Sequence, residues 1–182
     1  MSKRAVLVVD IQNDYFPSGK YALTNIEQAA GNAARVIAAA RDKGDEVIHV
    51  QHIFLDPQAP FFIADTEGAQ IHDTVRPAEG EALVVKHHPN PFLDTGLKDM
   101  LDARGIDEVA VVGAMSHMCI DAAVRAASDF GYKTTVVQDA CATRDLDFEG
   151  VTVPAAQVHA ALMSSLGFAY AKVTTTDEYV AG

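Results

Sequence analysis

The stretch Ala5-Val6-Leu7-Val8-Val9-Asp10 is a continuous apolar run that stops at a carboxylate. It shows no alternation between apolar and polar residues, so both faces of the strand that it forms are expected to be covered. A strand buried on both faces is typical of a parallel sheet between two layers of helices. This short run therefore predicts an α/β fold, with Asp10 at the carboxyl end of its first strand.

The rest of the chain repeats this unit, because strand and helix signals alternate along it. Further strands are predicted at residues 46–52, 82–85, 108–112, 133–138 and 168–173. Helices are predicted over residues 24–43, 94–104, 120–130 and 154–166, ended by Gly44, Gly105, Gly131 and Gly167. Thr24-Asn25-Ile26-Glu27 has the pattern of a capping box for the first helix. The alternation predicts a doubly wound, six-stranded parallel sheet in the order 3-2-1-4-5-6, with helices on both faces.

Length, composition and charge restrict the class of protein. The 182 residues, of which 49% are hydrophobic and 21% charged, predict one globular domain over residues 1–182. The sequence shows no transmembrane run and no signal peptide, so a cytoplasmic location is expected. Two cysteines are too few for a disulfide framework. The net charge of −11 argues against nucleic acid and anionic membranes as partners, but it says little about a small-molecule substrate, which is the expected partner and meets only the local field of its pocket.

Three chemically useful residues follow the carboxyl ends of predicted strands. Asp10 ends the first strand, Lys86 ends the third, and Cys119 lies at a helix start after the fourth. The first and fourth strands are neighbours at the switch point of such a sheet, where ligands bind. Each residue alone also has an ordinary explanation, as a turn aspartate, a surface lysine or a packed thiol. Their convergence at one edge of the sheet favours a catalytic site.

The chemistry of these side chains suits nucleophilic catalysis. A thiol at the first turn of a helix, beside Lys86, is expected to have a lowered pKa, because both surroundings favour the thiolate. Asp10 is expected to take the thiol proton and later to deliver it to a leaving group. The backbone N–H groups of Met115 and Cys119 are candidates for an oxyanion hole. The pattern predicts attack on a carbonyl and a covalent acyl-enzyme on Cys119.

The motifs around these residues resemble those of the isochorismatase-like cysteine hydrolases, relatives of nicotinamidase and N-carbamoylsarcosine amidase. Residues 10–16, Asp-Ile-Gln-Asn-Asp-Tyr-Phe, are similar to the family's D-x-Q-N-D-F opening. Lys86 with the downstream Pro91-Phe92 is similar to its lysine and N-x-F motif. Residues 113–119, Gly-Ala-Met-Ser-His-Met-Cys, resemble its G-x-x-T-x-x-C segment. The likeness covers about residues 4–178, with Ser116 where threonine is commoner and Tyr15 where phenylalanine is usual.

The resemblance implies an isochorismatase-like fold, a catalytic triad of Asp10, Lys86 and Cys119, and a homodimer or homotetramer. It also implies a cis peptide bond between Ala114 and Met115, which turns the Met115 N–H into the oxyanion hole. No cofactor is expected. Nicotinamidases hold a metal through an Asp-x-His pair after the second strand.

The positions that match the nicotinamidase pair here are His52 and Phe54, so no metal site is predicted. His49 and His52 are three residues apart on a strand and are expected to point to opposite faces. His87, His88 and His117 are expected at the surface or in a cap or interface.

Candidates for substrate contacts flank the triad or lie in the long irregular segment of residues 53–81; they are Gln12, Tyr15, Phe62 and Met118. The leading hypothesis is a metal-independent cysteine hydrolase that cleaves the C–N bond of a small amide. One alternative is hydrolysis of the vinyl ether of isochorismate, which needs an acid but no thiol. The other is a non-catalytic protein that binds a ligand on the same fold.

Overall fold

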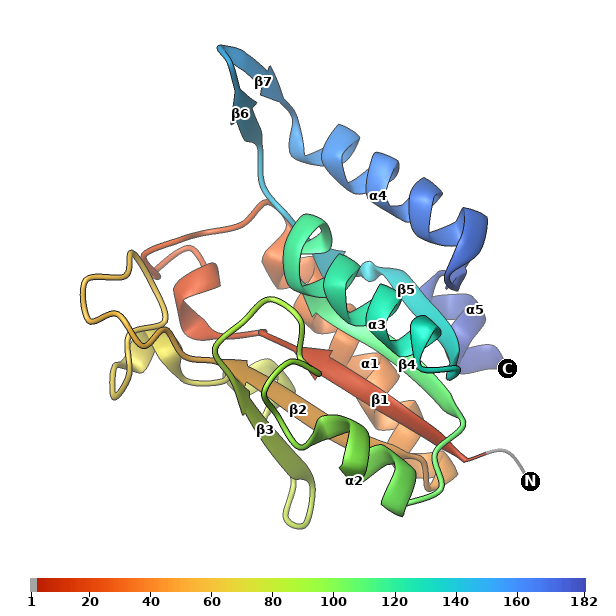
Figure 1. Cartoon of the computed structure of the whole chain (residues 1–182). Helices are drawn as coiled ribbons and strands as arrows, with labels where there is room; N and C mark the ends of the chain where they lie inside the picture. The colour runs from red at the N-terminus through yellow and green to blue at the C-terminus, as the bar shows by residue number, and fades with distance from the viewer. Residues whose placement is uncertain (1–2) are drawn as a thin grey trace.

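A six-stranded parallel sheet lies at the centre of the computed structural model, which describes residues 3–182 (Figure 1). Its strands are β1 (Arg4–Val9), β2 (Glu46–His52), β3 (Ala82–Lys86), β4 (Glu108–Ala114), β5 (Lys133–Ala142) and β8 (Lys172–Thr174). The spatial order is β3-β2-β1-β4-β5-β8, and every neighbouring pair is parallel. The predicted order is confirmed, because β8 is the sixth strand of this sheet along the chain.

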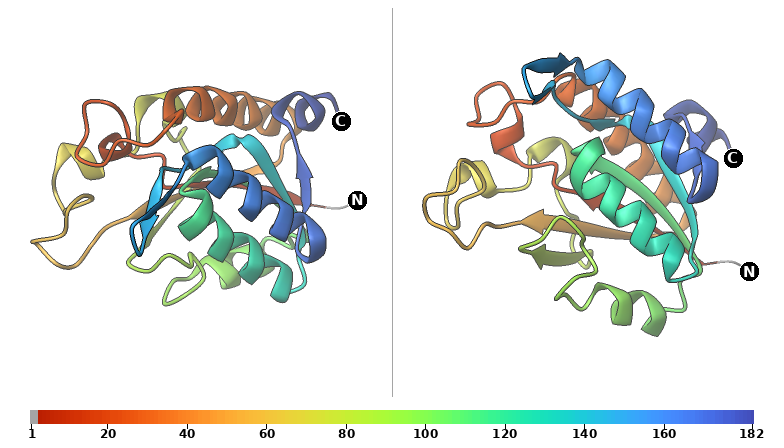
Figure 2. Two further views of the ribbon diagram at one scale, coloured as in Figure 1. Left: turned by 90° about the horizontal axis from the view of Figure 1, so that it is seen from above. Right: turned by 45° about the horizontal axis from the view of Figure 1, so that its top comes forward.

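Helices cover both faces of the sheet, as the view from above in Figure 2 shows. The helices α1 (Ile26–Lys43) and α5 (Thr176–Ala181) lie on one face, and α2 (Leu97–Ala103), α3 (Asp121–Asp129) and α4 (Ala155–Ala169) lie on the other. The apolar run of β1 serves both layers. Val6 and Val8 pack into the core beneath α1, whereas Leu7 and Val9 pack into the core beneath α2 and α3. Alternating side chains of one buried strand thus build two cores.

Several element boundaries differ from the predicted ones. The prediction of a capping box at residues 24–27 is wrong. The N-cap residue of α1 is Asn25, which has a left-handed conformation and whose side chain makes no capping hydrogen bond. Gly167 does not end α4, which continues to Ala169, so the last strand shrinks to three residues. A capping box does form at Thr175 and Glu178, where it begins the unpredicted helix α5.

A short hairpin, β6 (Leu146–Phe148) and β7 (Val151–Val153), was not predicted either. It projects from the body of the molecule together with α4 (Figure 1). Strands of three residues are too short to leave a periodic signal in the sequence. No helix within residues 3–182 combines the length and the hydropathy that crossing a membrane requires.

Gly113 lets β4 approach β1 closely at the edge of the sheet where the site forms. It pairs with Val9, and its φ of +128° is one that L side chains rarely adopt. A Cβ atom at this position would lie within van der Waals overlap of the Val9 carbonyl oxygen. The glycine therefore sets how closely the end of β4 lies to Asp10.

Replacement of Gly113 by alanine is expected to lower the free energy of unfolding by about 3 kcal/mol, because it combines a clash with backbone strain. Thermal and urea-induced unfolding would measure the loss. Gly31→Ala is the matched control, since nothing lies within 4 Å of the added carbon in the exposed middle of α1. That control should gain about 0.5–1 kcal/mol. Equal stability of the two variants would contradict the role of Gly113.

Candidate active site

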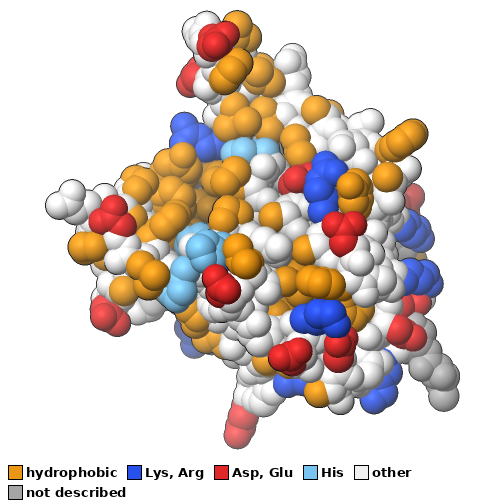
Figure 3. Space-filling model, viewed as in Figure 1, with side chains coloured by type: hydrophobic (Ala, Val, Ile, Leu, Met, Phe, Trp, Pro, Cys, Tyr) orange, Lys and Arg blue, Asp and Glu red, His pale blue; other side chains and the backbone are white. Residues whose placement is uncertain are grey.

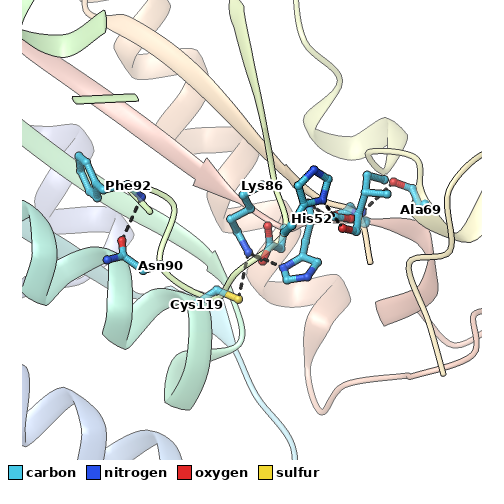
Figure 4. A network of polar contacts seen from close by, with 10 residues as sticks. His52, Ala69, Lys86, Asn90, Phe92 and Cys119 are labelled. Atoms are coloured by element: carbon cyan, nitrogen blue, oxygen red, sulfur yellow. Dashed lines mark hydrogen bonds and ion pairs between the residues drawn. The ribbon is translucent and has the colours of Figure 1, made fainter. Parts of the chain in front are cut away.

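The structure brings Asp10, Lys86 and Cys119 together at the carboxyl edge of the sheet, where Lys86 points toward Cys119 (Figure 4). The Lys86 ammonium lies 2.8 Å from a carboxylate oxygen of Asp10 and 3.3 Å from the sulfur of Cys119. Asp10 and Lys86 are fully buried, and Cys119 is 5% exposed. The three residues that the sequence grouped therefore meet in a dry, enclosed place.

Asp10 leaves the sheet in a left-handed backbone conformation, with a φ of 53°. Aspartate tolerates this region better than most residues, and such conformations concentrate at functional sites. Its N–H still donates to the carbonyl of Val50 at 3.0 Å, so the backbone remains tied to β2 while the side chain turns toward Lys86. The turn places a carboxylate, which needs solvation, against an ammonium group.

The Lys86 ammonium has three N–H bonds and three neighbours that accept them. Besides Asp10 and Cys119, it lies 2.7 Å from Nδ1 of His52, its partner in the register of β2 and β3. Burial lowers the pKa of Lys86, whereas the charge of Asp10 and the hydrogen bonds to Asp10 and Cys119 raise it, with a net upward shift. Lys86 is therefore a permanent cation at the centre of the site.

The thiol of Cys119 is not activated at rest, so the prediction of a lowered pKa is wrong. Burial, followed by the negative charge of Asp10, raises the pKa of Cys119 well above its ordinary value, although Lys86 acts in the opposite direction. Burial also raises the pKa of Asp10, against the effect of Lys86. The helix dipole invoked from the sequence is too weak to offset removal of the sulfur from water. At rest Cys119 is therefore a protonated thiol beside the ion pair of Lys86 and Asp10.

A π-helical turn, Ser116–Ile120, carries Cys119 from β4 into α3. The carbonyl of Met115 accepts from the N–H groups of Met118 and Ile120, at 3.0 and 3.2 Å, which closes the turn over the sheet edge. The peptide bond between Ala114 and Met115 is cis. π-Helical turns are rare in proteins, and those that occur are often at functional sites.

Gln12 does not fit its predicted role as a substrate contact. It is fully buried, and its amide nitrogen donates to the carbonyls of His52 and Ala69 at 2.9 and 2.7 Å. Its amide oxygen accepts from the His52 N–H at 2.8 Å. All of these polar atoms bind backbone groups, so Gln12 fastens the end of β2 to the segment that follows it.

Two further residues of the same motif anchor residues 53–81. Asn13 donates to the carbonyl of Glu67 at 2.8 Å, and the buried carboxylate of Asp14 accepts from the Phe62 N–H at 2.8 Å. Gly68 packs so closely on Asp14 that a Cβ atom would clash with the carboxylate. This anchoring was missed from the sequence, because the polar residues of a motif look alike whether they hold substrate or backbone.

The remaining candidates for substrate contacts divide by burial. Phe62 is fully buried and packs on the ring of Tyr15 with centroids 4.5 Å apart, so it is a core residue and its predicted contact with substrate is not supported. Tyr15 is 2% exposed. Burial, followed by the charge of Asp10, raises the pKa of Tyr15. Met118 is 41% exposed beside the nucleophile and stays a candidate wall of the entrance.

The histidines beyond His52 have their own contacts. His87 and His88 are exposed, and Figure 3 shows histidines at the surface beside a hydrophobic area. His49 lies 3.0 Å from Glu81, so it and His52 contact different groups, as their spacing predicts. His117 contacts the hydroxyl of Thr143 at 2.6 Å.

A metal ion would need the atoms that Lys86 already contacts. Asp10, His52 and Cys119 offer ligand atoms that all lie within 4.8 Å of one another. The Lys86 nitrogen touches each of the three residues, at distances of 2.7 to 3.3 Å. The ammonium therefore stands where a metal ion held by these three residues would have to lie. The contact with His52 was not foreseen, because it depends on the register between β2 and β3.

Comparison with known proteins gives one consistent result. Residues 4–178 match the model of the isochorismatase domain. An uncharacterized isochorismatase family protein of Bacillus subtilis (strain 168) is 52% identical over 97% of this chain and 98% of its own length. The maleamate amidohydrolase of Pseudomonas putida is 31% identical over 80% of this chain and 75% of its own length. A crystal structure from Oleispira antarctica, provisionally described as an isochorismatase hydrolase, has a TM-score of 0.96 at 52% identity, over 100% of this chain and 97% of that one.

Lys86→Met is expected to destabilise the fold by about 3–5 kcal/mol near pH 7, because it leaves the Asp10 carboxylate buried and unpaired. The folded-state pKa of Asp10 is already raised and rises further without Lys86, so the ionised form opposes folding. The loss should shrink as the pH falls through that raised pKa and Asp10 takes up a proton. Urea denaturation at pH 7 and pH 5 would measure it.

The double variant Asp10→Asn/Lys86→Met is the control for this prediction, since it removes both charges together. Its loss of stability should be smaller than that of Lys86→Met alone and independent of pH between 5 and 7. A loss in Lys86→Met that stays constant over this range would contradict the assignment of Asp10 as the responsible group.

Proposed function

This chain belongs to the isochorismatase family of hydrolases, and from that premise we propose that it is a metal-independent cysteine hydrolase of small amides. The observation that carries the proposal is the ammonium of Lys86, in contact with both the Asp10 carboxylate and the Cys119 sulfur in a buried site. A nucleophile, a proton acceptor and a fixed cation within contact distance are the parts that acyl transfer needs. The named activity of one relative, maleamate amidohydrolase, is of this chemical class.

In the first half of the reaction, the sulfur of Cys119 attacks the amide carbonyl while its proton passes to the Asp10 carboxylate. Because both pKa values are raised, proton transfer and attack proceed together and no thiolate needs to accumulate. The backbone N–H groups of Met115 and Cys119 stabilise the oxyanion of the tetrahedral intermediate. Asp10 then delivers its proton to the departing nitrogen, the C–N bond breaks, and the acyl group remains on sulfur.

In the second half, water attacks the acyl carbon and gives a proton to Asp10. Collapse of the second tetrahedral intermediate breaks the C–S bond, and Asp10 returns the proton to the sulfur. Lys86 stays charged throughout, since it holds carboxylate and sulfur together and takes no part in proton transfer. The cycle consumes one water and restores the thiol, so it requires no cofactor.

Vinyl-ether hydrolysis, the other chemistry considered, needs an acid to protonate carbon and no thiol. It would leave unexplained why the sulfur of Cys119 lies 3.3 Å from the Lys86 nitrogen. A purely binding role would leave unexplained a fully buried Asp10–Lys86 ion pair, which costs more to bury than an apolar pair of the same volume. The amidase proposal accounts for both observations.

Cys119→Ala is expected to lower amide hydrolysis by about 1,000-fold or more, because it removes the nucleophile. The assay would measure ammonia release from a panel that includes maleamate, nicotinamide and N-carbamoylsarcosine. Cys141→Ala is the matched control, because Cys141 is the other buried cysteine and its thiol donates to the Val137 carbonyl. That control should keep the wild-type rate. Hydrolysis that survives in Cys119→Ala would contradict the mechanism.

Self-association into a homodimer or homotetramer is also proposed, with a second copy of this chain as the partner. Phe148 and Val151 on the hairpin are 72% and 62% exposed, and Phe168 on α4 is 92% exposed. Phe148 and Val151 lie on the hairpin that projects at the top of Figure 1, whereas Phe168 lies near the opposite end of α4. Exposed apolar side chains on a projecting hairpin and its adjoining helix are typical of a contact surface.

Size-exclusion chromatography coupled to light scattering should give a molar mass two or four times that of one chain. The double variant Phe148→Ser/Phe168→Ser should lower that mass, because it removes two of the exposed apolar side chains. Leu55→Ser, which changes a side chain that is 76% exposed in the segment between β2 and β3, serves as the control and should leave the mass unchanged. A wild-type protein with the mass of one chain would end the proposal.

A further inference from the structure

His52 carries a buried polar atom that has no partner among residues 3–182. The side chain is 4% exposed, and its Nε2 makes no hydrogen bond. The ring packs against the rings of Phe54 and Phe62, with centroids 4.3 and 6.2 Å away, which offer no acceptor. A buried polar group without a partner is disfavoured by about 1–3 kcal/mol, so its persistence calls for an explanation.

The contact with Lys86 decides which nitrogen of His52 carries the proton. Nδ1 lies 2.7 Å from the Lys86 nitrogen, and an ammonium group donates only. Nδ1 must therefore accept, and in a neutral imidazole the proton then sits on Nε2. Burial and the charge of Lys86 lower the pKa of His52 to about 3, so the ring stays neutral near pH 7.

We propose that His52 is a substrate-binding residue whose Nε2–H donates a hydrogen bond to an acceptor atom of the amide that Cys119 attacks. One ring nitrogen of His52 lies within 4.8 Å of both an Asp10 carboxylate oxygen and the Cys119 sulfur, so the imidazole borders the reaction centre. The inference rests on the proposed function, because it takes the Cys119 sulfur as the reacting atom.

The fixed tautomer also restricts the substrate. A donor at His52 and a cation at Lys86 together favour an oxygen or an unprotonated nitrogen near the scissile carbonyl, and they reject an ammonium group there. The expected substrates are therefore small amides that carry a second acceptor, such as a carboxylate, a carbonyl or a ring nitrogen, close to the bond that breaks. His52 acts by hydrogen bonding alone and exchanges no proton.

Alkylation of Cys119 by two reagents of similar size tests the donor without requiring hydrolysis. Iodoacetamide carries a carbonyl acceptor next to the reacting carbon, whereas allyl iodide carries none. Mass spectrometry would follow alkylation of Cys119 by each reagent. The rate with iodoacetamide divided by the rate with allyl iodide should fall about tenfold in His52→Leu, which has no donor. His52→Gln offers an acceptor to Lys86 and an N–H group to the reagent, so it should restore most of the ratio.

The ratio cancels any general change in the nucleophile, and His49→Gln provides the control of a second buried histidine on β2. An unchanged ratio in His52→Leu would overturn the assignment; if the buried thiol of Cys119 reacts with neither reagent, the ¹⁵N NMR measurement below decides instead. Should His52→Leu fail to fold, ¹⁵N NMR of the wild type decides, because protonation at Nδ1 excludes the proposed donor. Absence of amide hydrolysis with a normal alkylation ratio would instead count against the proposed function alone.

Discussion

The ammonium group of Lys86 is the interaction on which the rest of the site depends. It pairs with Asp10, donates to Nδ1 of His52 and lies against the sulfur of Cys119. A charge buried this deeply is tolerated only when its surroundings supply opposite charge and hydrogen-bond acceptors. Asp10, His52 and Cys119 come from three different segments, and each supplies an acceptor for the ammonium. Replacement of any one of them would leave an N–H group of Lys86 buried without an acceptor.

The position of the ammonium depends in turn on the sheet. Lys86 pairs with His52 in the register of β2 and β3, and Val9, next to Asp10, pairs with Gly113 at the end of β4. A shift of one residue in either pairing would turn these side chains to the other face of the sheet. The hydrogen bonds that join the Gln12 amide to the N–H and the carbonyl of His52 also fix the end of β2.

Apolar runs and strand–helix alternation were enough to predict the sheet, its order and the meeting of Asp10, Lys86 and Cys119. The pKa of Cys119 could not be predicted from the sequence, because it depends on depth of burial. The sequence shows that Cys119 lies at a helix start, but not that its surroundings exclude water and so raise its pKa. Gln12 was misassigned for a related reason: a buried amide that holds backbone and one that holds substrate have the same residue type. His52 became important only when the strand register placed it against Lys86.

The charge balance of the site explains why a protonated thiol suits this arrangement. With Asp10 ionised, Lys86 charged and Cys119 neutral, the buried group carries no net charge. A resting thiolate would add a second anion beside a single cation, in surroundings where charge is poorly screened. Negative charge is better tolerated after attack, because it then moves to an oxyanion that backbone N–H groups can reach. In this arrangement the nucleophile is generated at the moment a carbonyl is in place, and the His52 donor helps to hold that carbonyl's molecule there.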